Sequence, residues 1–146
     1  MPQRTAEAAW NGDLRGGSGR IKLGSGAFDG AYSYGSRFEQ SAGTNPEELI
    51  AGAHAGCFTM ATASGLSKAG FKPENIATKA TVHLDSVPQG FKIARIDLDM
   101  EADVPGIDET KFLEIAEAAK KNCPVSQALA AVPEITLRAR LRQKAS

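Results

Sequence analysis

Two cysteines, Cys57 and Cys123, carry the most reactive side chains of this sequence, and they lie 66 residues apart. A cysteine thiol is either an inert buried hydrophobe or a redox or catalytic group, and its surroundings decide which. Cys57 follows very small residues, Ala51-Gly52-Ala53 and Ala55-Gly56, which suit the close approach of another backbone. A solvent-facing helix has no use for them, so we look for function first in this stretch.

The residues ahead of Cys57 begin a helix. Asn45 is a suitable N-cap, and Pro46 fits the first helical position, where a missing N–H costs nothing. Glu47 and Glu48 then fall in the first turn, where the helix dipole favours negative charge. The local sequence predicts that both glutamates stabilise the start of the helix. The alternative is that they take part in a reaction.

The same helix places His54 one turn before Cys57. Ile50, His54, Cys57 and Ala61 step by four, three and four residues, which predicts one packed face. His54 on that face is predicted to be a hydrogen-bonded packing residue, with tuning of the thiol as the alternative. Gly70 is a suitable helix stop.

Arg37 lies between Tyr34 and Phe38 at the end of a glycine-rich segment, so it is either a surface residue or is directed into a pocket. The first forty residues alternate in short stretches such as Arg20–Leu23, which predicts a small meander of strands. Their glycines match neither the phosphate loop nor the dinucleotide fingerprint. A nucleotide cofactor therefore has no support.

The second half of the chain predicts a hairpin, a helix pair and a last strand. Cys123 is followed at once by Pro124, so it lies at a helix junction where unsatisfied N–H groups favour a thiolate. His83 is on the polar phase of its strand and is assigned no chemistry. The predicted elements are strands 77–84, 91–100 and 134–141, and a helix after Asp108. Their order along the chain indicates an α+β domain with helices packed on antiparallel sheet.

Composition limits the function classes. The 146 residues suit one domain, and 17 basic against 17 acidic residues leave no net charge, unlike a nucleic-acid or membrane-surface binder. No apolar run approaches the roughly 20 residues of a membrane span, and no signal peptide is apparent. Two histidines and two cysteines lack metal-ligand spacing. We therefore expect a cytoplasmic protein without a metal or other cofactor.

Three stretches resemble the OsmC family of thiol-dependent hydroperoxide reductases: Thr44–Leu49, Ala53–Phe58 and Cys123–Ser126. The likeness extends from Trp10 to the last strand. It implies one OsmC-like domain over residues 1–146, with antiparallel sheets packed around two central helices in an intertwined homodimer. It also implies an organic hydroperoxide substrate and a dithiol reductant of the lipoyl type.

The resemblance assigns a role to each candidate site residue. Cys57 corresponds to the peroxidatic thiolate and Cys123 to the resolving thiol. Glu47 and Arg37 correspond to the polar pair that holds the peroxide and the thiolate. The sister Ohr branch takes its arginine from an earlier strand, where Arg20 is the nearest candidate, so Arg20 is the alternative to Arg37.

These roles describe a two-cysteine, metal-free peroxidase. Cys57 would reduce the hydroperoxide to an alcohol and become a sulfenate, and Cys123 would convert the sulfenate to a disulfide that a dithiol can reduce. The alternative is a non-catalytic redox-sensing or small-molecule-binding module of the same fold.

Helix geometry predicts that the site is shared between two copies of the chain. Glu47 and Cys57 are ten residues apart, about 15 Å along one helix, too far to hold one peroxide together. If the same helix of a second copy crosses it antiparallel about a two-fold axis, residue 47 of one copy meets residue 57 of the other when they cross at Gly52. Each site would then take Cys57 and Cys123 from one chain, and Glu47 with Arg37 from its partner.

Overall fold

The computed structural model describes residues 1–142, which form two compact units. The first is Met1–Leu49 and the second begins at Ile50, so the division falls inside helix α2 (Pro46–Lys68). Each unit is described by itself. The single domain expected over residues 1–146 stays a prediction, and residues 143–146 lie outside the described chain.

The first unit is built on a three-stranded antiparallel sheet in the order β1-β2-β3. Its strands are β1 (Ala6–Asn11), β2 (Ser18–Leu23) and β3 (Asp29–Tyr32), which confirms the predicted meander. Trp10 of β1 and Tyr32 of β3 pack edge to face across Gly19 of β2, with ring centroids 5.3 Å apart. Ile21, at 8% exposure, is the buried hydrophobic side chain of these described strands.

A short helix, α1 (Tyr34–Phe38), follows β3 and was not expected from the sequence. Ser33 caps it by accepting a hydrogen bond from the Ser36 N–H, and the Ser36 hydroxyl accepts one from the Ser33 N–H in return. This reciprocal cap satisfies two N–H groups that a helix start otherwise leaves open. The helix fixes the backbone of Arg37, its penultimate residue.

The second unit holds a sheet in the order β4-β5-β6, with β4 (Asn75–Val87), β5 (Gly90–Asp103) and β6 (Glu134–Leu141). The hairpin and the last strand are where the sequence predicted them. One feature differs, because β6 pairs parallel to β5 whereas antiparallel sheet was expected. Between them the chain crosses over through α3 (Glu109–Asn122) and α4 (Pro124–Ala128), and such a crossover permits parallel pairing.

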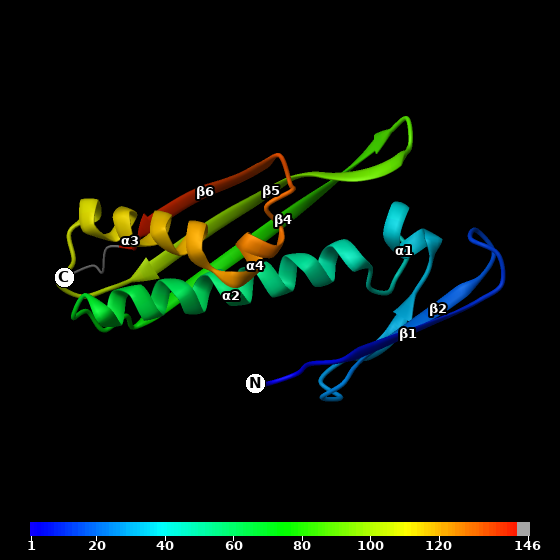
Figure 1. The fold of residues 1–146 in the computed structure, drawn as a ribbon, viewed down its shortest axis with the longest axis horizontal. Helices are drawn as coiled ribbons and strands as arrows, with labels where there is room; N and C mark the ends of the chain where they lie inside the picture. The colour runs from blue at the N-terminus through cyan, green and yellow to red at the C-terminus, as the bar shows by residue number, and fades with distance from the viewer. Residues whose placement is uncertain (143–146) are drawn as a thin grey trace. The chain divides into compact units, whose positions relative to one another are not determined.

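The core of this second unit lies between the sheet and the helices α2 and α3, which run along its strands in Figure 1. Ile96, Leu98 and Met100 alternate along β5 and point into this core, where they pack with Phe58 of α2 and Phe112 of α3. All five are at most 1% exposed. Each such side chain contributes roughly 1.5–3 kcal/mol by burial, so the helix carrying Cys57 is held firmly.

Both ends of α2 are capped as the sequence predicted. The Asn45 side chain accepts a 2.7 Å hydrogen bond from the Glu48 N–H, and Pro46 is the first helical residue. At the other end Gly70 has a φ of +90°, which other residues rarely adopt, and the Phe71 N–H donates to the Leu66 carbonyl.

Helix α2 also has an exposed face of small and apolar residues. Over 18 residues its mean hydropathy is 1.2 and only 22% of the window is buried, so by length and composition it could cross a membrane. No such run was predicted from the sequence, and the core helix of a non-membrane protein passes the same test. Met60 is 75% exposed, and a methyl group at Gly52 or Gly56 would meet nothing within 4 Å. Nothing within the described chain explains these two glycines.

Candidate active site

Arg37 and Glu47 form a two-pronged ion pair in the first unit. The Arg37 Nε donates to Glu47 Oε1 and Nη2 donates to Oε2, both at 2.9 Å. Glu47 is only 9% exposed, and both of its carboxylate oxygens accept hydrogen bonds from this partner. The carboxylate therefore has a use beyond helix capping, and the guanidinium plane is fixed by the fork.

The neighbouring polar side chains tie α1 to the start of α2. The Ser36 hydroxyl donates to the Thr44 carbonyl at 2.7 Å, and the Asn45 amide donates to the Ser36 carbonyl at 3.0 Å. Glu48 accepts from the Thr44 hydroxyl at 2.8 Å. Glu48 is thus engaged in the helix start, while Glu47 holds Arg37. These contacts were not predicted from the sequence, although the serine pair Ser33 and Ser36 is a capping signal.

The Arg37 side chain also borders a hollow of about 420 Å³ in the first unit. Its walls are largely aromatic and apolar, so the hollow combines a hydrophobic surface with one guanidinium. This combination suits an organic molecule that carries a polar or anionic end. The side chains that line it belong to Trp10, Leu14, Tyr32, Ser33, Tyr34, Arg37 and Phe38.

Arg20, the alternative arginine, lies on β2 and is paired differently. Its Nε contacts Asp29 Oδ1 at 2.6 Å, and its side chain is 62% exposed. An exposed pair of this kind adds little stability and leaves its charges screened by water. In this unit, Arg37 is therefore the arginine that binds Glu47, whereas Arg20 binds Asp29.

Cys57 and Cys123 come together in the second unit, where both are free thiols. Cys57 is half-buried on α2, whereas Cys123, at 1% exposure, lies at the predicted junction between α3 and α4. Burial raises the pKa of the Cys57 thiol, the Val125 N–H lowers it in part, and the neighbouring Cys123 thiol raises it further. Among residues 50–142, no cation is a cause of this shift.

A chain of hydrogen bonds leads from Cys123 to His54. The Cys123 thiol donates to the Ser126 hydroxyl at 3.1 Å, and that oxygen lies 2.7 Å from His54 Nε2. The Ser126 N–H donates to the Cys123 sulfur at 3.3 Å. Burial lowers the pKa of His54, which is fully buried. His54 is a buried, hydrogen-bonded residue, as the sequence predicted. Its partner Ser126 was not predicted from the sequence.

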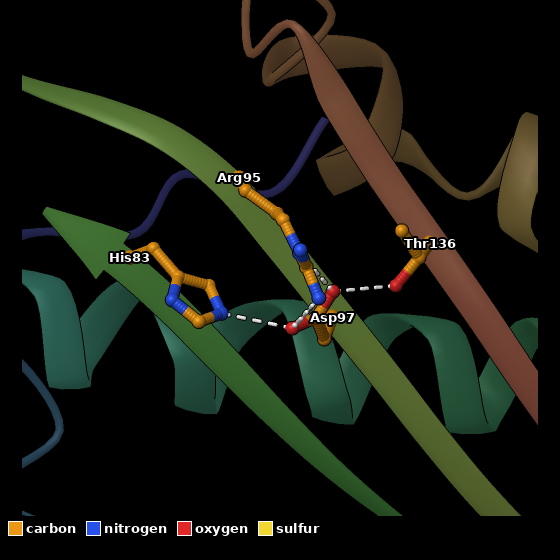
Figure 2. Close-up of polar contacts among 4 residues, drawn as sticks. All are labelled: His83, Arg95, Asp97 and Thr136. Atoms are coloured by element: carbon orange, nitrogen blue, oxygen red, sulfur yellow. Dashed lines mark hydrogen bonds and ion pairs between the residues drawn. The ribbon is translucent and has the colours of Figure 1, made fainter. Parts of the chain in front are cut away.

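The other histidine belongs to a polar cluster on the opposite, partly exposed face of the second sheet (Figure 2). His83 Nε2 contacts Asp97 Oδ2 at 2.8 Å, while Arg95 Nε and the Thr136 hydroxyl donate to Oδ1 at 2.7 and 2.6 Å. These bonds join β4, β5 and β6, and hydrogen bonding by Arg95 holds the pKa of Asp97 well below its usual range. Within residues 1–142, no three His, Cys, Asp or Glu side chains are grouped to hold a metal ion.

Comparisons with known proteins give the family of the chain. Residues 38–138 match the family model described as OsmC-like protein. The chain is 48% identical over 135 residues to Peroxiredoxin OsmC of Escherichia coli (strain K12), covering 92% of this chain and 93% of that protein. It is 30% identical over 96 residues to an organic hydroperoxide resistance protein of Xanthomonas axonopodis pv. citri, covering 65% and 66%.

The fold is found among solved structures as well. An OsmC-like protein from Mycoplasma pneumoniae superposes with a TM-score of 0.76 at 18% identity, covering 97% of this chain and 99% of that one. At this identity the likeness concerns the fold alone, and it agrees with the α+β class expected from the sequence. Together with the match over residues 38–138 and the 48% identity, it shows that the chain belongs to the OsmC-like protein family.

Proposed function

We propose that the protein is a two-cysteine, metal-free peroxidase that reduces organic hydroperoxides to alcohols. The proximity of the Cys57 and Cys123 thiols carries this proposal, because Cys123 is near enough to raise the pKa of Cys57 and a sulfenate formed there would have its resolving thiol beside it. The names of the relatives, a peroxiredoxin and an organic hydroperoxide resistance protein, support the same activity.

The reaction follows the thiol oxidation ladder. The Cys57 thiolate attacks one oxygen of the O–O bond, the bond breaks, and the alkoxide leaves and is protonated to an alcohol. Cys123 then displaces hydroxide from the Cys57 sulfenic acid and forms the disulfide. An external dithiol, of lipoyl type in this proposal, reduces that disulfide by two thiol exchanges and restores both thiols.

The aromatic hollow beside Arg37 supports an organic substrate. Its volume of about 420 Å³ is within the range of small-molecule sites, and its rings offer apolar area to an alkyl or aryl group. The Arg37 guanidinium would bind the peroxide end, with Glu47 holding its plane. We place this chemistry in the reducing cytoplasm, where free cysteines persist.

We further propose that the site is composite, with Arg37 and Glu47 supplied by a second copy of the chain. The pKa of Cys57 is raised in its own unit, so a peroxidatic thiolate needs a cation from elsewhere. An antiparallel crossing of two α2 helices at Gly52 would bring one. The open space at Gly52 and Gly56 supports such a crossing, because each glycine costs roughly 1 kcal/mol in a helix without another gain.

The first unit gives independent support for an intertwined homodimer. Its described strands bury a single hydrophobic side chain, Ile21, and its other buried residues are the polar Ser36, Thr44 and Glu47. A sheet of three strands needs a larger apolar contact to be stable. In this proposal, residues 1–146 form one OsmC-like domain whose core is completed by the partner chain.

The test is turnover of cumene hydroperoxide with dihydrolipoamide, comparing wild type with Cys57→Ser. We expect steady alcohol production by wild type and none by the variant. If both are inactive but peroxide still forms a Cys57–Cys123 disulfide in wild type, the protein is the redox-sensing module instead. If neither turnover nor the disulfide occurs, both functions are wrong.

A further inference from the structure

We propose that Ser126 and His54 are positioning residues of the resolving step, forming a proton path that turns Cys123 into a thiolate when it attacks the Cys57 sulfenic acid. This inference rests on the proposed two-cysteine function and adds to it the route of one proton. Neither residue touches the hydroperoxide; both act through Cys123.

The path is continuous and buried. It runs from the Cys123 sulfur to the Ser126 hydroxyl over 3.1 Å and from there to His54 Nε2 over 2.7 Å. The three side chains come from the α3–α4 junction, α4 and α2, and they are 1%, 7% and 0% exposed. Packing fixes all three, so the proton path is preformed.

The burial of Cys123 explains why such a path is needed. A free thiol has a pKa near 8.5 and is mostly protonated at neutral pH, yet only the thiolate is a good nucleophile. At 1% exposure, Cys123 has almost no contact with water or a dissolved base. The base must come from the protein, and His54 is the basic side chain that the hydrogen bonds of Cys123 reach.

The step balances in atoms and electrons. As the Cys123 proton moves to Ser126 Oγ, the Ser126 hydroxyl proton moves to His54 Nε2. The Cys123 sulfur forms the S–S bond, the S–O bond of the Cys57 sulfenic acid breaks, and hydroxide leaves. Return of the proton to hydroxide gives water. Cys123 is oxidised and the Cys57 sulfur is reduced, so no other oxidant is required.

The surroundings of His54 make it a temporary carrier of the proton. Burial keeps the ring neutral and able to accept, and Nδ1 has no hydrogen-bond partner among the described residues, so the imidazolium is not stabilised there. No charged group of the described chain contributes to the shift. The titratable groups that face His54 are Cys123, through Ser126, and Cys57 beyond it. The Ser126 N–H meanwhile stabilises the sulfur anion.

The experiment follows both chemical steps in the full-length protein after mixing with one equivalent of cumene hydroperoxide. Samples are quenched with acid, alkylated and analysed by mass spectrometry for Cys57 sulfenic acid and for the disulfide. The variants are Ser126→Ala, His54→Gln, which keeps an amide hydrogen bond but carries no proton, and Ser126→Thr, which restores a hydroxyl. Thr62→Val is the matched control, because it removes a buried hydroxyl that lies on α2 and outside the proton path.

We expect disulfide formation in Ser126→Ala and His54→Gln to slow by roughly 100-fold relative to Cys57 oxidation, the usual size of a base contribution. Between pH 6 and 8, their rate should rise about tenfold per pH unit, as for an unassisted thiol. Wild type, Ser126→Thr and Thr62→Val should vary little over this range. A structural defect alone would not change the pH profile in this way.

The inference is overturned if Ser126→Ala forms the disulfide at the wild-type rate with the wild-type pH profile. If the variants do not fold, the pH dependence of disulfide formation in wild type provides the test. A tenfold rise in that rate per pH unit would also overturn the inference. In both cases the proposed function stands, because the disulfide still forms. If wild type forms no Cys57–Cys123 disulfide, the proposed function itself fails, and this inference with it.

Discussion

The two units of the chain differ in what they bury. Residues 1–49 bury one hydrophobic side chain, Ile21, and the carboxylate of Glu47, which the partly exposed Arg37 holds in a two-pronged ion pair. The described residues from Ile50 onward bury an extended hydrophobic core, and their reactive groups are two thiols and a neutral histidine. One unit supplies fixed charge and the other supplies sulfur in an apolar setting.

The difference supports the proposal that the two units act together in one site. A thiol in an apolar core is protected from water, but its pKa rises, as that of Cys57 does. A guanidinium held by a carboxylate can stabilise an anion, but it is no nucleophile. Peroxidase chemistry needs both, and the proposed dimer combines them.

The strongest test of this comparison mixes two inactive chains. Cys57→Ser lacks the nucleophile and Glu47→Ala lacks the group that orients Arg37, so each homodimer should be inactive. Co-refolded heterodimers should regain one working site of two, because one composite site takes both intact contributions. Activity is measured with cumene hydroperoxide after the heterodimer is isolated through two different affinity tags. An inactive heterodimer of confirmed composition would contradict the composite site.

Removing the second thiol should stop turnover after one event. Cys123→Ser should consume about one equivalent of peroxide and then accumulate sulfinic or sulfonic Cys57, since no partner thiol resolves the sulfenate. Mass spectrometry of the intact protein measures the added oxygen atoms. Sustained turnover of Cys123→Ser with the same dithiol would mean that an external thiol resolves Cys57.

Replacing the arginine of each candidate pair should separate Arg37 from Arg20. Arg37→Lys keeps the charge but loses the two-pronged bond to Glu47, so we expect Cys57 oxidation to slow by roughly 100-fold. Arg20→Lys, the matched control on an exposed pair, should stay within about twofold of wild type. Stopped-flow rates at equal peroxide concentration provide the measurement, and the reverse ranking would reassign the arginine.

The smallest effect is expected on the exposed face of the second sheet. Asp97→Asn should lower the free energy of unfolding by about 1–2 kcal/mol at pH 7, because hydrogen bonds to a charged carboxylate are lost. The pKa of Asp97 is depressed in the folded protein, so its contribution is present above the unfolded pKa of about 3.9 and is lost as the pH falls below it.

Urea denaturation at pH 7 and at pH 3 measures this contribution. The gap between wild type and Asp97→Asn should narrow at the lower pH, while peroxidase activity at pH 7 stays unchanged. An equal gap at both values would show that the carboxylate charge does not stabilise the sheet.

The sequence was most informative where local chemistry decides the structure. Asn45, Pro46 and Gly70 set the ends of α2 by their own backbone preferences, and Pro124 broke the helix next to Cys123. The resemblance to the family predicted that Arg37 pairs with Glu47, and this ion pair is present in the structure. The catalytic role of these residues stays a prediction.

What the sequence did not predict depends on partners distant along the chain. His54 and Ser126 are 72 residues apart, so no periodicity links them. The parallel pairing of β6 with β5 follows from the direction of a crossover, which alternation of apolar residues does not encode. Helix α1 was missed because its five residues are too few to show a helical period, although Ser33 and Ser36 mark its start.

The exposed face of α2 has a consequence for how the protein behaves in dilute solution. If Gly52, Gly56 and Met60 are covered only by a second copy, folding and association are one equilibrium, and apparent stability follows mass action. Each tenfold dilution then removes about 1.4 kcal/mol of association free energy at 25 °C. Peroxidase activity per chain would fall on dilution, and the midpoint of thermal unfolding would rise with protein concentration.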